Sequence, residues 1–197
     1  AILAQAISSR IPGRATTHAS APPPSPMGLR GGDDDSREAG LRVEARLHKC
    51  LAEDDFPGAL TACSEAIEAE PWNGELWRLR AALLLGCSDA AGAERDASEG
   101  IARGADLVSA LTIRAAARYS REDWAGAIED CTLIIEADPS SAGAWSTRGR
   151  ARGAIDDAHG ALEDSSRAVE LNPFDAGAWR VRGAARLELG DAAGAEA

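Results

Sequence analysis

A 34-residue repeat constrains this chain more than any other feature of its sequence. The segments AGAWSTRG and AGAWRVRG begin at Ala142 and Ala176, and the same register extends back to Val108, Gly74 and Gly40 without a gap. A fixed period of this length is typical of solenoid proteins, in which each unit buries its apolar face on its neighbours. Among the places that carry the same residue in all five units are arginine in the seventh (Arg46, Arg80, Arg114, Arg148, Arg182), aspartate in the sixteenth (Asp55, Asp89, Asp123, Asp157, Asp191) and alanine in the twentieth (Ala59, Ala93, Ala127, Ala161, Ala195).

Each unit is predicted to form a pair of antiparallel helices. In the fourth unit Trp145 and Gly149 recur at helical spacing, Asp157 interrupts the pattern, and a second set of small and apolar residues follows at intervals of three and four. Pro173 ends the unit, because proline disfavours the helical conformation in the residue before it. The fold class is therefore all-α, a right-handed solenoid of helix pairs. The expected helices are 41–53, 56–69, 75–87, 90–103, 108–121, 124–137, 142–155, 158–171 and 176 to about 189.

The sequence divides into a tail and a repeat array. Residues 1–39 contain a proline-rich run at 22–26, the pair Gly31-Gly32 and three consecutive aspartates, and they offer too little apolar surface to offset the entropy of ordering. We expect a disordered tail or linker. Residues 1–32 also contain arginines but no acidic residue, as organelle transit peptides do, so a chloroplast or mitochondrial location is the alternative to a cytoplasmic one. The predicted array covers 40–197, with units 40–73, 74–107, 108–141, 142–175 and a shortened 176–197.

The charge of the chain argues against two classes of partner. The net charge is −11 at pH 7; residues 1–32 carry +3 and the remainder −14. Nucleic acids and anionic membranes are bound mainly by basic surfaces. No apolar run approaches the ~18 residues of a membrane span. We therefore expect neither nucleic acid nor membrane as a partner.

The four cysteines predict neither a metal site nor a disulfide framework. Cys50, Cys63, Cys87 and Cys131 form no CxxC pair and have no histidine at metal-ligand spacing. All four fall on places that the register assigns to helix packing, so we expect buried, reduced thiols and a reducing compartment. The sequence also has no glycine-rich phosphate loop and no nucleophile motif. We expect no enzymatic activity and no cofactor.

The repeated aspartate and arginine have predicted structural roles. An aspartate before a helix accepts backbone N–H groups of the first turn, which contributes about 0.5–2 kcal/mol. The seventh-place arginine has an aspartate sixteen residues later in three units and is expected to bridge the two helices, although a row of arginines for binding phosphate or carboxylate is the alternative. Unit one has Ala62 in that place, so Arg46 lacks this partner. The expected pairs are Arg80–Asp96, Arg114–Asp130 and Arg148–Asp164.

One repeated feature has no explanation in the sequence. Glycine fills the nineteenth place of every unit, at Gly58, Gly92, Gly126, Gly160 and Gly194. Glycine inside a helix costs up to about 1 kcal/mol relative to alanine. Close approach of a neighbouring unit and a bias in coding are both open.

Further places carry a pattern shared with a known family. They are tryptophan in the fourth place (Trp77, Trp145, Trp179), a small residue in the eighth (Ala81, Ala115, Gly149, Gly183), and proline in the thirty-second (Pro71, Pro139, Pro173). With these residues the chain resembles the tetratricopeptide repeat (TPR) proteins over residues 40–197. Unit one departs from the pattern with Val43 in the fourth place. Unit two has Ala105 in place of the proline, so its second helix is expected to end differently.

The resemblance implies a protein–protein interaction scaffold. In this family a concave face made by the first helix of each unit holds a peptide or helix of a partner protein. The chain is then expected to act as a monomer or as part of a larger protein. The inward-facing candidates for partner binding are Arg78, Thr112, Tyr119, Ser146, Arg150 and Arg180.

Two alternatives follow from the same resemblance. The segments Glu129–Cys131 and Glu163–Ser165 are similar to those of co-chaperone members, which bind the acidic C-terminal tails of heat-shock chaperones through a carboxylate clamp of lysine, asparagine and arginine. Arg78 and Arg150 would supply cations for such a clamp, but the asparagine places hold Ala82 and Ile113. The other alternative is the adaptor part of a larger enzyme, such as a J-domain protein.

Overall fold

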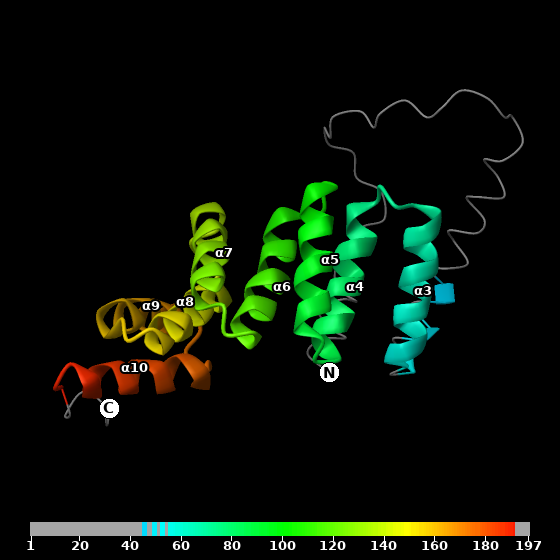
Figure 1. The fold of residues 1–197 in the computed structure, drawn as a ribbon. Helices are drawn as coiled ribbons and strands as arrows, with labels where there is room; N and C mark the ends of the chain where they lie inside the picture. The colour runs from blue at the N-terminus through cyan, green and yellow to red at the C-terminus, as the bar shows by residue number, and fades with distance from the viewer. Residues whose placement is uncertain (1–44, 47–48, 51, 54, 192–197) are drawn as a thin grey trace, which may run out of the picture. The chain divides into compact units, whose positions relative to one another are not determined.

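The computed structural model describes residues 45–46, 49–50, 52–53 and 55–191. In that part of the chain every regular element is a helix and no strand occurs, so the predicted all-α fold is confirmed (Figure 1). The predicted tail at 1–39 lies outside the described residues, as does much of the expected helix at 41–53. The chain falls into two compact units, residues 1–71 and 72–197.

The first compact unit contains helix α3 (Phe56–Ala69). The Asp55 side chain accepts a hydrogen bond from the N–H of Gly58 at 3.0 Å. Pro57 lies in the first turn, where its missing N–H would have had no partner within the helix. Arg46, for which the sequence predicts no partner at the usual place, pairs instead with Glu65 at 2.7 Å.

The second compact unit contains seven helices within its described residues. Their bounds agree to within one or two residues with those predicted from the repeat. They are α4 (Gly74–Gly86), α5 (Ala90–Ala102), α6 (Leu107–Ser120), α7 (Trp124–Ala137), α8 (Ala142–Ala154), α9 (Ala158–Leu171) and α10 (Ala176–Glu188).

The order of packing in this unit follows the order of the chain. Each helix from α4 to α10 packs against the next one, as antiparallel pairs joined by short turns require (Figure 1). The first helices of successive repeats also pack on each other: α4 on α6, α6 on α8 and α8 on α10. These four helices therefore share one face of the unit.

The capping aspartates explain the repeated glycine. A Cβ on Gly126 would lie 2.9 Å from Cγ of Asp123 and closer still to its Oδ2. The added Cβ would also lie 2.9 Å from Cδ of Arg118, so glycine here relieves crowding within one helix pair and not the approach of a neighbouring repeat. The same contact with the capping carboxylate is found at each described aspartate of the sixteenth place, and the predicted caps are confirmed: Asp55 with Gly58, Asp89 with Gly92, Asp123 with Gly126 and Asp157 with Gly160. The caps Asp106 and Asp175, by contrast, accept from the N–H groups of Ser109 and Ala178, which carry a Cβ.

The residue just before the sixteenth-place aspartate has a left-handed backbone in units two to five. Ser88, Glu122 and Asp156 have φ angles of 66°, 63° and 62°, and Gly190 has 83°. This conformation costs about 1–2 kcal/mol for a residue with a Cβ. Glycine in unit five therefore suits the turn better than the residues of units two to four.

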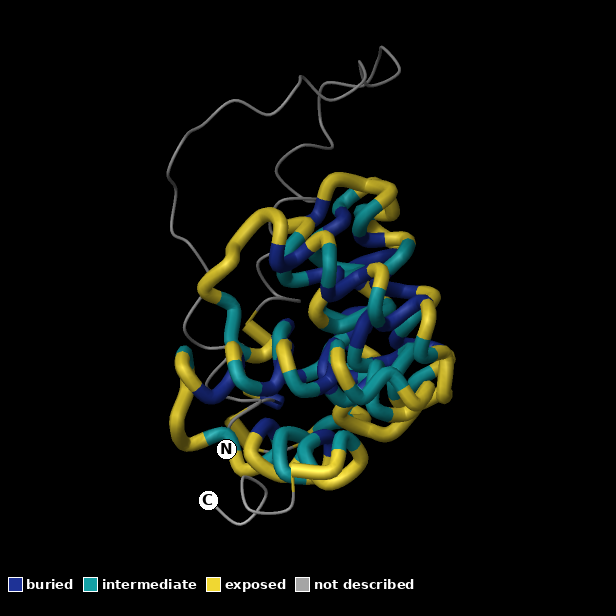
Figure 2. The backbone as a smooth tube through the Cα atoms, turned by 90° about the vertical axis from the view of Figure 1, so that its left-hand side faces the viewer, coloured by how far each residue is buried: buried dark blue, intermediate teal, exposed yellow. Residues whose placement is uncertain are grey.

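Small residues and one tryptophan form much of the core. The twentieth-place alanines Ala93, Ala127 and Ala161 are at most 1% exposed, as expected where two helices touch. Figure 2 shows buried stretches alternating with exposed turns along the helices. Trp145 packs against two neighbouring core clusters, and its indole N–H donates to the carbonyl of Pro139 at 3.0 Å. The tryptophan and proline of the repeat thus join successive repeats.

The second helix of unit two ends differently from the others, as expected. Helix α5 ends at Ala102 and is followed by Gly104 with a φ of 79°. The N–H of Ala105 then bonds to the carbonyl of Gly100 at 2.9 Å. Helices α7 and α9, which precede Asp-Pro and Asn-Pro, end instead at an extended residue.

The expectation of four buried thiols is wrong at one position. Cys50, Cys63 and Cys131 are buried, but Cys87 is exposed because it follows the last residue of α4 and faces away from the packed helices. Burial raises the pKa of Cys131 to about 12, and the charge of Asp130 acts in the same direction.

Candidate functional site

The arginine ladder, defined as Arg80, Arg114 and Arg148, is held within its own helix pairs. Arg148 donates from Nε to Oδ2 of Asp164 at 2.9 Å and from Nη2 to Oδ1 at 2.8 Å. This hydrogen bonding to a fully buried carboxylate is the main reason that the pKa of Arg148 is raised. The predicted bridges Arg80–Asp96 and Arg114–Asp130 have the same two-point geometry. All three predicted pairs are confirmed.

A second arginine on each of two aspartates was missed from the sequence. Arg118 lies 3.1 Å from Oδ2 of Asp130, and Arg152 lies 3.0 Å from Oδ2 of Asp164. Both arginines occupy the eleventh place of their units, twelve residues before the aspartate. Arginine recurs in this place in units three, four and five, and that recurrence is the signal that would have revealed the pairing.

The ladder also connects neighbouring helix pairs. Arg148 donates from Nη1 to the hydroxyl of Thr132 in the preceding pair at 3.1 Å, and Arg114 does the same to Ser98 at 3.5 Å. Thr132 in turn donates to the carbonyl of Ile128. These arginines are engaged in structural contacts, so the alternative of an open row of arginines for anions does not fit their geometry.

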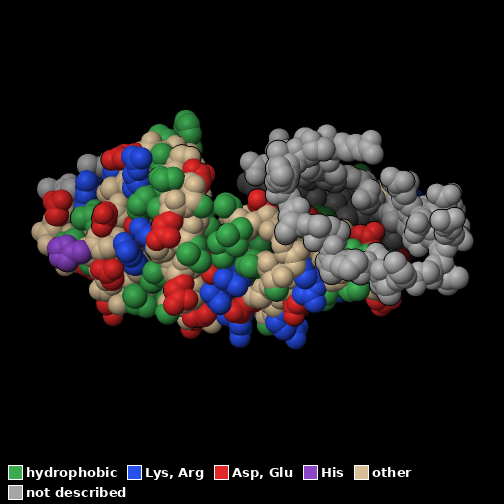
Figure 3. Space-filling view, turned by 90° about the horizontal axis from the view of Figure 1, so that it is seen from above, with side chains coloured by type: hydrophobic (Ala, Val, Ile, Leu, Met, Phe, Trp, Pro, Cys, Tyr) green, Lys and Arg blue, Asp and Glu red, His purple; other side chains and the backbone are tan. Residues whose placement is uncertain are grey.

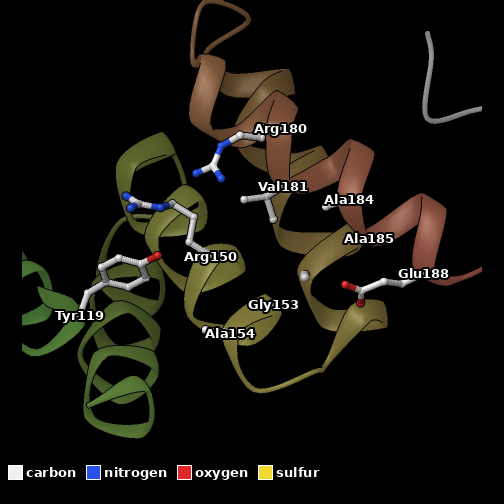
Figure 4. A pocket seen from close by; sticks show the side chains of 10 residues that line it. Tyr119, Arg150, Gly153, Ala154, Arg180, Val181, Ala184, Ala185 and Glu188 are labelled. Atoms are coloured by element: carbon white, nitrogen blue, oxygen red, sulfur yellow. The ribbon is translucent and has the colours of Figure 1, made fainter. Parts of the chain in front are cut away.

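A hollow of about 250 Å³ lies on the face where α6, α8 and α10 meet, and we call it the α8–α10 hollow (Figure 4). Three of the six predicted binding residues line it together: Tyr119, Arg150 and Arg180. They come from three successive repeats, so only the packing of α6 on α8 and of α8 on α10 brings them together. The complete lining is Tyr119, Arg150, Gly153, Ala154, Ala161, Arg180, Val181, Ala184, Ala185 and Glu188.

The positive and negative side chains of the hollow lie at opposite ends of it. The guanidinium of Arg150 lies 4.3 Å from the centre of the Tyr119 ring, a favourable cation–π distance. Its buried Nε has no hydrogen-bond partner. Within the described part of the chain, neither Arg150 nor Arg180 forms an ion pair with a carboxylate. Figure 4 shows the two arginines at one end of the hollow and Glu188 at the other.

The other three predicted binding residues lie outside this hollow. Arg78 pairs with Glu75 at 2.6 Å on α4. Thr112 is exposed on α6 and donates to the carbonyl of its own helix at Val108. Ser146 is buried and hydrogen-bonds to Asp175, the residue that caps α10.

Asp175 connects the hollow electrostatically to the start of α10. Burial acts to raise the pKa of Asp175, but hydrogen bonds from Ser146 and from the N–H groups of Ala178 and Gly177, together with the charge of Arg150, outweigh it and lower the pKa. Asp175 therefore stays ionised and keeps its cap on the N–H of Ala178 at 3.0 Å.

Other kinds of site find little support in the described residues. They contain no cluster of three or more histidine, cysteine or acidic side chains able to hold a metal ion. None of the helices described is long and apolar enough to cross a membrane. Figure 3 shows acidic and basic side chains interspersed on the face it presents, without a continuous basic area.

Comparisons with known proteins identify the fold. No protein-family model matches the sequence, and no curated protein matches it. Among solved structures, the crystal structure of MamA protein is 18% identical, covers 81% of this chain and 87% of its own, and has a TM-score of 0.74.

Two more of the matching structures have a similar fold. MamA from Desulfovibrio magneticus RS-1, residues 41 to the end, is 17% identical over 81% of this chain and 90% of its own, with a TM-score of 0.76. YrrB, described as a TPR protein with an unusual peptide-binding site, is 12% identical over 82% of this chain and 84% of its own, with a TM-score of 0.70. At such identities the likeness concerns the fold. The chain has the fold of a tetratricopeptide repeat protein.

Proposed function

We propose that this chain is a non-catalytic interaction scaffold and that the α8–α10 hollow binds a short segment of a partner protein. The observation that carries the proposal is the meeting of Tyr119, Arg150 and Arg180, two of them arginines without an ion-pair partner in the described residues. Arginine and tyrosine are frequent anchors of protein interfaces. The guanidinium of Arg150 packs over the Tyr119 ring at 4.3 Å, which holds its other N–H donors beside the hollow.

The size of the hollow favours an extended segment. Its volume of about 250 Å³ is at or below the low end of the ~300–1,000 Å³ of ligand pockets. A helix with its side chains is about 10–12 Å across and would not enter such a space. The description of YrrB as a peptide-binding TPR protein supports a peptide as the ligand class, since the two chains share a fold.

An acidic chaperone tail is the less favoured ligand. Of the two cations available for a clamp, Arg78 is already paired with Glu75. The places of the clamp asparagines hold Ala82 and Ile113, which offer no side-chain amide. A titration with a chaperone C-terminal peptide separates the two ligands, because salt-sensitive binding lost with Arg78→Ala would favour the tail.

The proposal is tested by selecting random 12-residue phage-displayed peptides on the full chain. Selected peptides are then titrated by fluorescence anisotropy against the wild-type chain and the double variant R150A/R180A. We expect binding to weaken at least about tenfold in the double variant, because charge-assisted contacts contribute about 1.5–3 kcal/mol each. Arg167→Ala is the matched control, since Arg167 pairs with Glu170 on the exposed surface of α9. Absence of any selected peptide, or equal binding by the double variant, would contradict the proposal.

A further inference from the structure

Building on the proposed function, we propose that the α8–α10 hollow selects an extended internal segment with an acidic side chain, a small residue two positions on, and a basic side chain four positions on. The charged groups at the two ends of the hollow set this pattern. Arg150 and Arg180 lie at one end and Glu188 at the other (Figure 4).

The acidic side chain belongs at the arginine end. A guanidinium offers a planar set of donors that matches a carboxylate at two points. The Arg150 guanidinium packs over the Tyr119 ring at 4.3 Å, which holds it beside the hollow. Arg180, which is exposed, adds a second positive charge from the next repeat. The pair therefore suits one carboxylate, whereas a neutral apolar side chain would leave the guanidinium donors without an acceptor.

The spacing between acid and base follows from helix α10. Arg180 and Glu188 are eight residues apart on one helix, which is about 12 Å at 1.5 Å per residue. An extended segment advances about 3.3 Å per residue and points alternate side chains to the same face. Residues i and i+4 thus lie about 13 Å apart on one face, which matches the separation of the two charged ends.

The small middle residue follows from the lining between the two ends. Gly153, Ala154, Ala184 and Ala185 present no side chain beyond Cβ, and Val181 adds an apolar wall. This lining lets a peptide backbone approach α8 and α10 closely. The side chain at i+2 points toward the same lining, so alanine or glycine fits there.

The segment is internal and not an acidic terminus. Glu188 disfavours a second negative charge at its end of the hollow, and the chain as a whole carries −11. An acidic C-terminal tail would place several negative charges along this face. A single carboxylate with a basic residue beyond it meets attractive charges at both ends.

The test uses a labelled, amide-capped peptide, Gly-Ser-Glu-Thr-Ala-Thr-Lys-Ser-Gly, titrated by fluorescence anisotropy against the full chain. Replacing its glutamate with glutamine should weaken binding at least about tenfold, because the acceptor for Arg150 loses its charge. Replacing its lysine with glutamine should weaken binding about two- to fivefold, because Glu188 is exposed and its pairing is screened. A peptide that ends at the glutamate with a free C-terminal carboxylate tests whether the hollow prefers a chain terminus. This peptide should bind more weakly than the parent.

A charge reversal provides the sharper readout. In the variant Glu188→Lys the parent peptide should lose affinity, and the peptide with glutamate in place of its lysine should gain about the same factor. No binding by the parent peptide, or no exchange of preference in Glu188→Lys, would overturn the inference. If phage-selected peptides still compete at the hollow but lack the acid–base pair, this inference fails and the proposed function stands. If no selected peptide depends on Arg150 and Arg180, both fail.

Discussion

Asp164 is the position where loss of one charge should cost the most stability. Its side chain is 0% exposed and accepts from two arginines, Arg148 at two points and Arg152 at 3.0 Å. Replacement by asparagine keeps the size but removes the negative charge, so the partly buried guanidinium of Arg148 loses its carboxylate and Arg152 keeps only the more distant Asp157, at 3.7 Å. Breaking a buried pair in this way costs about 3–5 kcal/mol, a large fraction of the about 5–15 kcal/mol of a typical domain.

The repeat supplies its own graded controls for this prediction. Asp96 is 9% exposed in its side chain and is bridged among described residues by Arg80, so Asp96→Asn should cost about 1–3 kcal/mol. Glu65 is paired with Arg46 on the surface, and Glu65→Gln should cost at most about 1 kcal/mol.

Urea unfolding of the full chain, followed by circular dichroism at 222 nm, measures the three variants against the wild type. The expected order of the loss is Asp164→Asn, then Asp96→Asn, then Glu65→Gln. Equal losses for the two aspartates, or a loss below about 1 kcal/mol at Asp164, would refute the claim that the ladder is a buried structural network.

Four further predictions concern individual glycine, aspartate and cysteine residues. Gly160→Ala should destabilise by about 0.5–1 kcal/mol because its Cβ would crowd the capping carboxylate of Asp157 and Cδ of Arg152. Gly153→Ala, whose Cβ would lie 3.8 Å from that of Ala161, should stabilise by a similar amount, and thermal melts of both variants test this. Asp156→Gly should raise the free energy of unfolding by about 0.5–1 kcal/mol by relieving a φ of 62°, and an unchanged melting temperature would count against this. Cys87 should react with a thiol reagent in the native protein, whereas the other described cysteines should react only after unfolding. Folding raises the pKa of Cys131 to about 12. The stability that its neutral thiol contributes is therefore present below about pH 9 and is lost as the pH rises toward 12. Cys131→Ala should flatten the plot of unfolding free energy against pH in that range.

The repeat register predicted the helices well because it sums many weak signals. Helix bounds, the capping role of Asp123 and the bridge between Arg148 and Asp164 all follow from places that recur at one period. The residue spacing within a helix pair is fixed by helix geometry, so an offset of sixteen translates directly into a contact.

The features that the sequence did not predict depend on contacts between individual atoms and not on residue spacing. The preference for glycine at Gly126 arises from crowding against the side chains of Asp123 and Arg118, which no residue pattern expresses. Cys87 is exposed because its helix ends one residue earlier than expected. The hollow joins Tyr119, Arg150 and Arg180 across three repeats, and their distances depend on how closely small side chains let the helices approach. The sequence therefore could not show which three of the six predicted binding residues line one hollow.

The measurement that tests the account most directly compares two arginines on one helix. Arg148 and Arg150 lie two residues apart on α8, the first bonded to Asp164 and the second lining the hollow. Urea unfolding and titration of the glutamate–lysine peptide are run on Arg148→Ala and Arg150→Ala, at a temperature where both are folded. We expect Arg148→Ala to lose about 3–5 kcal/mol of stability and to keep affinity. Arg150→Ala should lose at most about 1 kcal/mol, the size of its contact with Tyr119, but about tenfold or more in affinity. Loss of affinity in Arg148→Ala with none in Arg150→Ala would contradict this expectation.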